Sequence, residues 1–127
     1  MNPPHVCLIC MGANRDSEWN LAAAVRELAR LFTLRQVGQP VRTPAEGGVK
    51  GAEDYFNQAV VLETELGREE TEAVFKTIER QLGRSPADKQ SGSVPLDIDL
   101  LQYDSLTLRP DDWRKSYVRK ALASCRL

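Results

Sequence analysis

The sequence predicts an α+β fold with elements in the order βαββαβ, followed by a C-terminal helix. Two segments repeat their apolar residues at helical spacing, and the runs around them have the composition and alternation of strands. This order is that of the split βαβ, or ferredoxin-like, arrangement. Such a sandwich has an antiparallel sheet with helices packed mainly on one face. We expect one domain over residues 1–127, because a chain of 127 residues can bury one core but not two.

The first strand is expected over residues 5–11, which contain two of the three cysteines. Cys7 and Cys10 have the C-x-x-C spacing, but on a strand two such side chains point to opposite faces. A zinc site takes about four ligands, and His5 is the single histidine of the chain. We therefore expect core cysteines in a reducing, cytoplasmic compartment.

A helix is expected next, because apolar residues recur at helical spacing after residue 20. They are Leu21, Val25, Leu28 and Phe32. Asp16 or Ser17 is expected to cap the N-terminus of this helix. Residues 33–43 are β-rich, and Gly38 and Pro40 within them indicate a bulge or an edge strand.

The middle of the chain predicts loop, strand, helix and loop. Residues 44–51 are expected to form a glycine-rich loop, and residues 55–66 are expected to form a strand. A second amphipathic helix is expected over residues 69–82, ended by Gly83. Residues 84–95 are a polar loop of 12 residues, long enough to be a functional lid or a disordered segment.

Asp97 and Asp99 are the strongest chemical feature of the sequence. They alternate with Leu96, Ile98 and Leu100 on a strand expected over residues 96–103. Residues two apart on a strand share a face and lie about 6.5–7 Å apart. Two carboxylates so placed can bind Mg²⁺, although a solvated acidic strand face has the same pattern.

Two further features have a chemical and an ordinary interpretation. Tyr55 and Asn57 share a strand face, where a ring and an amide could bind a planar heterocycle or form a partly exposed surface. Arg84 and Lys89 lie in the polar loop, and the C-terminal segment, expected to be helical over residues 111–126, is basic. The cations of residues 106–127, a range that includes this segment, are Arg109, Arg114, Lys115, Arg119, Lys120 and Arg126. They suit a polyphosphate or a solvated helix face.

The composition excludes several classes of partner. Hydrophobic residues make up 42% and charged residues 28%, as in ordinary globular proteins. The net charge of −1 gives no global field for nucleic acid or an anionic membrane. An apolar run long enough for a membrane span is missing from the sequence, and a secretory signal is not expected.

Five motifs, in this order, resemble the 6-hydroxymethyl-7,8-dihydropterin pyrophosphokinases of folate biosynthesis, which have the ferredoxin-like fold. The motifs are Gly12-Ala-Asn14, Arg42-Thr-Pro44, Asp54-Tyr-Phe-Asn57 with the strand after it, Ile78-Glu79 with Gly83-Arg84, and Leu96-Asp-Ile-Asp-Leu100. The resemblance runs from Val6 to about Tyr103 and weakly to the end of the chain.

The resemblance implies pyrophosphoryl transfer from ATP to the hydroxymethyl oxygen of the pterin, with release of AMP. It implies that Asp97 and Asp99 hold Mg²⁺ on the triphosphate and that Arg84 joins them in catalysis. The residues that it implies for pterin binding are Thr43, Pro44, Ala45, Tyr55, Asn57 and Tyr117. Those that it implies for nucleotide binding are Glu79, Lys89, Leu100 and Lys115. The implied partners are small molecules, and we expect a monomer or a weak homodimer.

The chain also departs from this family. The family's lid loop carries several arginines and a tryptophan, whereas residues 86–95 hold one cation, Lys89. The family's Pro-His segment is missing as well, so the chain is interpreted as a shortened, divergent member. The sequence therefore leaves three hypotheses: an Mg²⁺-dependent pyrophosphokinase, a non-catalytic pterin- or nucleotide-binding relative without the lid, and an unrelated interaction module.

Overall fold

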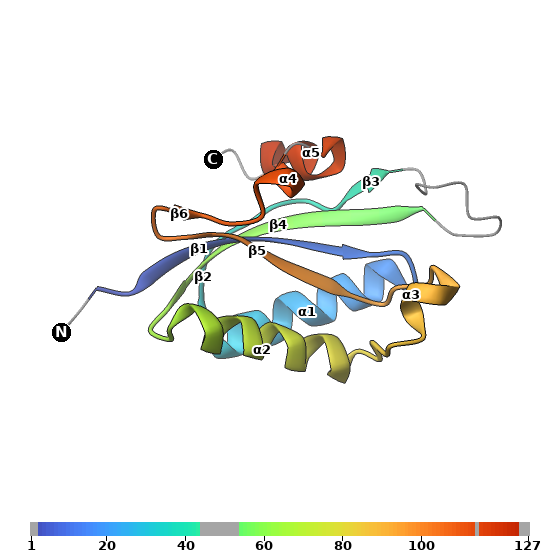
Figure 1. Ribbon diagram of the computed structural model, residues 1–127, viewed down its shortest axis with the longest axis horizontal. Coiled ribbons are helices and arrows are strands. Elements are labelled where there is room, and N and C mark those ends of the chain that lie inside the picture. Colours follow the sequence, from blue (N-terminus) through green and yellow to red (C-terminus); the bar gives the residue numbers. More distant parts are fainter. Residues whose placement is uncertain (1–2, 44–53, 114, 125–127) are drawn as a thin grey trace.

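A six-stranded antiparallel sheet forms the centre of the computed structural model, which describes residues 3–43, 54–113 and 115–124 (Figure 1). The central strand β1 (His5–Ala13) lies between β4 (Tyr55–Thr64) and β5 (Asp97–Tyr103). The outer strands are β2 (Thr33–Val37) and β3 (Val41–Thr43), both paired with β4, and β6 (Leu106–Thr107), paired with β5. The predicted ferredoxin-like order is confirmed, with β2 and β3 in the place of one strand.

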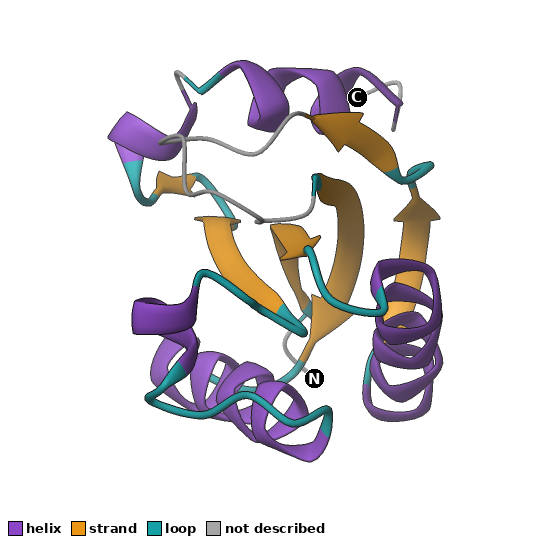
Figure 2. Ribbon diagram, turned by 90° about the vertical axis from the view of Figure 1, so that its right-hand side faces the viewer, coloured by secondary structure: helices purple, strands orange, loops and turns teal. Residues whose placement is uncertain are grey.

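Helices cover the two faces of the sheet unequally (Figures 1 and 2). The long helices α1 (Ser17–Leu31) and α2 (Arg68–Gln81) lie on one face, as expected. The short helices α4 (Pro110–Trp113) and α5 (Ser116–Ser124) lie on the other face. The predicted C-terminal helix is thus two helices, and α5 covers the second face. None of the helices within the described ranges is long and apolar enough to cross a membrane.

The main core lies between β1, β4, β5 and the two long helices. Its largest fully buried side chains are Phe75, Ile9, Met11, Leu21, Leu28, Leu62, Ile78 and Leu96. Cys7 belongs to this core, whereas Cys10 packs on the opposite face with Val118 and Ala121 of α5. The expectation that the two thiols point apart is confirmed. Burial raises the pKa of the Cys7 thiol to about 12, so this cysteine is unreactive.

The predicted bulge or edge is the interruption between β2 and β3. Gly38 lies in this gap, and its N–H donates to the Ala59 carbonyl at 2.8 Å. Its own carbonyl accepts a hydrogen bond from the Gln58 side chain at 2.8 Å. The two short strands therefore remain attached to β4 as one interrupted edge.

The predicted N-cap position of α1 is confirmed for Asp16, but the side-chain capping hydrogen bond expected there is not formed. Asp16 occupies the N-cap position in a left-handed conformation (φ 47°), and its side chain makes no capping hydrogen bond. The Ser17 hydroxyl donates backwards to the Ala13 carbonyl at 2.9 Å. The reason is the abrupt turn from β1 into α1, in which the Asn20 amide donates to the Arg15 carbonyl at 2.8 Å.

The polar loop before β5 has a defined structure, so the disordered alternative is wrong. It contains the one-turn helix α3 (Asp88–Ser91), and the buried Asp88 carboxylate accepts the N–H of Ser85 at 2.8 Å. The Asn14 side chain donates to the Gly92 carbonyl at 2.7 Å and accepts the N–H of Val94. These contacts attach the loop to the turn that follows β1, and this long-range attachment is invisible in the local sequence.

Candidate active site

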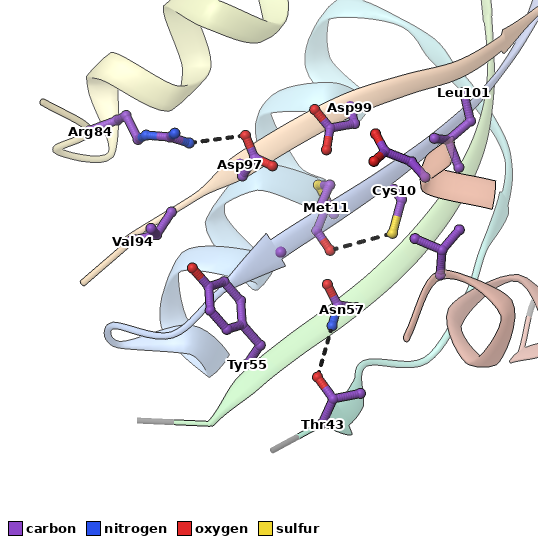
Figure 3. Close-up of a pocket in the computed structure, with 13 residues that line it drawn as sticks. Cys10, Met11, Thr43, Tyr55, Asn57, Arg84, Val94, Asp97, Asp99 and Leu101 are labelled. Atoms are coloured by element: carbon purple, nitrogen blue, oxygen red, sulfur yellow. Dashed lines mark hydrogen bonds and ion pairs between the residues drawn. The ribbon is translucent and has the colours of Figure 1, made fainter. Parts of the chain in front are cut away.

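A cavity of about 340 Å³ opens where β1 ends and where β4 and β5 begin (Figure 3). This volume is in the range of small-molecule sites. Its polar lining comes from four strands and the segments beside them. The lining residues that carry the argument are Gly12, Thr43, Tyr55, Asn57, Asp97 and Asp99, with Arg84 and Val94 at one end.

Strand register sets the geometry of this cavity. Gly12 of β1 pairs with Asn57 of β4 on one side and with Asp97 of β5 on the other. Directly paired residues point to the same face of a sheet, so the amide and the carboxylate stand on either side of Gly12. The backbones of β4 and β5 are two strand spacings apart, and each spacing is about 4.8 Å. Because glycine has no Cβ, the space between them stays open.

The β4 side of the cavity carries the predicted ring-binding pair. Asn57 is buried, and its Nδ2 donates to the Thr43 Oγ1 at 3.3 Å. Tyr55 lies two residues before Asn57 on the same face, and both side chains line the cavity. Figure 3 shows Tyr55 and Asn57 across the strand β1 from Asp97 and Asp99. The structure therefore brings together an aromatic ring, an amide and two carboxylates.

The β5 side of the cavity holds both carboxylates beside arginines. Asp97 Oδ1 accepts from Arg84 Nη1 at 3.0 Å, and the same nitrogen donates to the Leu96 carbonyl at 2.9 Å. Asp99 Oδ1 lies 3.3 Å from Arg109 Nη2. The Asp97 and Asp99 side chains are 36% and 25% exposed, so both carboxylates remain reachable from the cavity.

The pKa of Asp99 shows that the neighbouring arginines do not fully compensate the negative charge of the two carboxylates. Burial first, and then the charge of Asp97 and a hydrogen bond with it, raise the pKa of Asp99 to about 7. Arg109 opposes this shift without cancelling it. A divalent cation between the carboxylates would stabilise both ionised forms. The residues present thus fit Mg²⁺, which commonly takes one or two protein carboxylates and completes its shell with water and phosphate oxygens.

A larger protein ligand set is not found in the part of the chain that the structure describes, where no group of three or more His, Cys, Asp or Glu residues is placed to hold a metal. A metal at Asp97 and Asp99 would therefore need ligands from water or substrate. This requirement is typical of a metal that works on a bound polyphosphate.

A second hollow, of about 230 Å³, lies between α2 and β5. Its lining residues are Glu72, Phe75, Lys76, Ile98, Asp99, Leu100 and Arg109. Asp99 lines both spaces, so its carboxylate stands at the boundary between the cavity and the hollow, whereas Asp97 lines the cavity.

Comparison with known proteins shows the family of this chain. Residues 8–126 match the family model described as 7,8-dihydro-6-hydroxymethylpterin-pyrophosphokinase (HPPK). The chain belongs to the HPPK family. Two similar proteins of Porphyromonas gingivalis, from strains ATCC 33277 and W83, are named 2-amino-4-hydroxy-6-hydroxymethyldihydropteridine pyrophosphokinase. Each is 27% identical over 136 residues, which cover 93% of this chain and 88% of the relative.

The remaining described residues that the HPPK resemblance implied lie at different places in the structure. Leu100 lines the hollow beside α2, and the Lys115 Nζ lies 3.1 Å from an oxygen of Asp112, which lines the cavity. Glu79 lines neither space: its buried carboxylate accepts the N–H of Ile98 at 2.7 Å and lies 3.4 Å from Lys76 Nζ. Its contact with a nucleotide stays a prediction.

Four implied residues cannot be placed at the site. Pro44 and Ala45 lie outside the described residues, and the side chains of Lys89 and Tyr117 lie outside them as well. For these residues the HPPK assignment remains a prediction from the sequence motifs.

Sequence reasoning did not single out three residues of this candidate site, Gly12, Arg109 and Asp112, although Arg109 was among the cations expected to suit a polyphosphate or a solvated helix face. Gly12 belonged to a quoted motif, but its place between Asn57 and Asp97 depends on strand register. Arg109 and Asp112 follow the short strand β6, and their side chains lie 3.4 Å apart beside Asp99. The basic composition of the segment was visible, but nothing local distinguishes Arg109 from its neighbours.

Proposed function

We propose that this protein transfers pyrophosphate from ATP to the hydroxymethyl oxygen of 6-hydroxymethyl-7,8-dihydropterin and releases AMP. Family membership supports the reaction class. The observation that carries the assignment of residues is the placement of Asn57 and Asp97 on either side of Gly12. This placement offers ring recognition at one end of the cavity and a charged reaction centre at the other.

The pterin is proposed to lie over Gly12 with its polar edge at Asn57. A side-chain amide offers one acceptor and two donors, which suits the edge of a planar heterocycle. Tyr55 supplies an aromatic face, and Thr43 holds the amide in place. The hydroxymethyl arm then points toward Asp97. The proposed partners of Tyr55 on the opposite ring face and of Asn57 at the edge are Tyr117 and residues 44–45.

Asp97 and Asp99 are the residues proposed to hold Mg²⁺. When bound, the metal neutralises charge on the triphosphate and orients it for transfer. Arg84 is fixed by Asp97 and by the Leu96 carbonyl, so a permanent cation stands beside the proposed reaction centre. A divalent cation held by Asp97 and Asp99 would favour the ionised form of Asp99, whose pKa is raised in its absence.

The nucleoside is proposed to occupy the hollow between α2 and β5. Leu100 lines that hollow, and Asp99 joins it to the pterin cavity. A triphosphate between the two spaces would pass the carboxylates and place its reacting phosphorus near the pterin hydroxyl. Proximity of this kind accounts for much of the catalysis of phosphoryl-type transfer. Lys89 and Lys115 remain proposed nucleotide contacts.

One observation favours a second candidate function, a pterin-binding protein without catalysis. Val94, an apolar residue, lines the cavity at the end of the polar loop, and Asn14 holds its backbone. A loop attached in this way brings a methyl-bearing side chain, rather than a cation, to the proposed reaction centre.

The decisive experiment is chromatographic detection of products. The purified protein would be incubated with ATP, Mg²⁺ and 6-hydroxymethyl-7,8-dihydropterin. We expect AMP and the pyrophosphorylated pterin in equal amounts, with none when the pterin is left out and none from the Asp97→Asn variant. Pterin binding by calorimetry without AMP would establish the second candidate. A protein that neither binds the pterin nor forms AMP would contradict both candidate functions.

A further inference from the structure

We propose that Arg109 is a phosphate-binding residue, held in reserve by Asp99 until metal and nucleotide enter. In the ligand-free protein its guanidinium is the counter-ion of Asp99. When a divalent cation takes that carboxylate, Arg109 binds the polyphosphate of the nucleotide instead. The inference rests on the proposed function.

The position of Arg109 is the first argument. Its Nη2 lies 3.3 Å from Asp99 Oδ1, and its Nη1 lies 3.4 Å from Asp112 Oδ2. The side chain lines the hollow proposed for the nucleoside, while both of its carboxylate partners line the pterin cavity. Its guanidinium is therefore next to the path that a triphosphate must take between the two spaces. With 48% of the side chain exposed, an incoming anion can reach it.

The backbone at Arg109 is the second argument. Its φ of 50° is left-handed, a conformation unfavourable for residues with a Cβ. The turn is fixed by the Leu108 N–H, which donates to the Leu101 carbonyl at 2.8 Å. The Trp113 indole N–H reaches the carbonyls of Leu101 and Leu108 at 3.2 and 3.0 Å. A position better suited to glycine thus holds an arginine aimed at the site, and such strain concentrates at functional sites.

The neighbouring cations give the third argument. The described cations that line the cavity or the hollow are Arg84, Lys76 and Arg109. Arg84 is held by the Leu96 carbonyl as well as Asp97, and Lys76 pairs with the buried Glu79, which no metal is proposed to displace. Arg109 pairs with two carboxylates, one of which the metal is proposed to take. Its planar fork of donors also matches phosphate oxygens better than a lysine does.

The test compares two variants with a control by calorimetry. Arg109→Gly removes the guanidinium and relieves the left-handed backbone, and Arg109→Lys keeps the charge without the fork. Arg30→Ala is the control, because Arg30 forms an exposed ion pair with Glu27 on α1, away from both spaces. Each protein would be titrated with Mg²⁺ alone, with AMP and Mg²⁺, and with a non-hydrolysable ATP analogue and Mg²⁺.

We expect Arg109→Gly to weaken binding of the ATP analogue by about 10-fold or more, the effect of losing charge-assisted hydrogen bonds. AMP affinity should change by less than about 2-fold, because AMP lacks the β and γ phosphates that Arg109 is proposed to bind. Mg²⁺ alone should bind as tightly as before or more tightly, since a competing cation is gone. The affinity of Arg109→Lys for the ATP analogue should lie between those of Arg109→Gly and the wild type. The affinity of Arg30→Ala should equal that of the wild type. The unfolding midpoint of Arg109→Gly should not fall.

Other outcomes overturn the inference. Equal losses for AMP and the ATP analogue, or a loss of Mg²⁺ binding, would show that Arg109 only maintains the shape of the site. An unchanged affinity of Arg109→Gly for the analogue would overturn the role of Arg109 while leaving the proposed function intact. A wild-type protein that binds no nucleotide with Mg²⁺ would contradict both.

Discussion

A Cβ built on Gly12 would lie 2.9 Å from the Asn57 Oδ1, closer than real Cβ contacts. The Tyr55 ring would be 3.8 Å away. The Asn57 amide is held on its other side by Thr43 at 3.3 Å, so it cannot move away freely. The absence of a side chain at Gly12 thus keeps the floor of the cavity open between the amide proposed to bind the ring and the carboxylate proposed to bind the metal.

Gly12→Ala should therefore damage pterin binding selectively. The new methyl group displaces the Asn57 amide, and we expect a loss of about 1–3 kcal/mol in pterin binding, the usual cost of overpacking a tight site. Binding of nucleotide with Mg²⁺ should stay within about 2-fold, since the hollow beside α2 does not include Gly12. Calorimetry with each ligand makes the comparison.

Gly67→Ala is the matched control for this change. A Cβ there would meet only the Glu70 Oε1 at 3.6 Å, an ordinary contact. It should leave pterin affinity unchanged. If Gly12→Ala also bound pterin like the wild type, the ring would not lie over Gly12.

Asn57→Ala should weaken pterin binding by about 1–3 kcal/mol, because polar groups of the ring edge would lose their partner. Gln58→Ala offers a control on the same strand. Gln58 is also a buried amide, but it belongs to the opposite face and donates to the Gly38 carbonyl. It should lower the thermal midpoint without changing pterin affinity. Equal pterin affinities for Asn57→Ala and the wild type would remove Asn57 from the proposed binding site.

Asp97→Asn and Asp99→Asn should each abolish the Mg²⁺ dependence of nucleotide binding. The substitutions keep the size of the side chain and remove the charge that a divalent cation requires. We expect losses of about 10-fold or more in affinity for an ATP analogue with Mg²⁺. Pterin affinity, measured without nucleotide, provides the internal control. Binding of Mg²⁺ and the analogue at wild-type strength would show that the aspartates are an ordinary acidic strand face.

Stability without Mg²⁺ should fall as the pH rises from about 4 to 7. The pKa of Asp99 is raised from 3.8 to about 7 in the folded protein, so the folded state binds a proton that the unfolded state has already lost in this window. The free energy of unfolding therefore decreases with pH, by on the order of 3–4 kcal/mol. Thermal unfolding of the wild type and of Asp99→Asn, each with and without Mg²⁺, measures this contribution.

Mg²⁺ at saturation should remove most of that decrease, because the cation replaces the proton on Asp99. Asp99→Asn should show a flatter dependence on pH and little response to Mg²⁺. A wild-type midpoint that follows the Asp99→Asn profile at every pH would show that Asp99 titrates normally.

The sequence alone determined the local pattern of this protein. Period-two alternation placed Asp97 and Asp99 on the same face of one strand, and Tyr55 and Asn57 on the same face of another strand. The reason is that successive side chains of a strand point to opposite faces. Helical spacing located α1 and α2 to within a few residues. These features depend on neighbours along the chain, so they are readable without coordinates.

Only the tertiary structure decided how these local pieces meet. The register of β1 with β4 and β5 places Asn57, Gly12 and Asp97 in one row, although these three residues are far apart in the chain. The hold of Asn14 on the polar loop and the pairing of Arg109 with Asp99 likewise join distant segments. Such contacts form because the packed sheet and its turns bring the groups together, and no local preference of the residues encodes them.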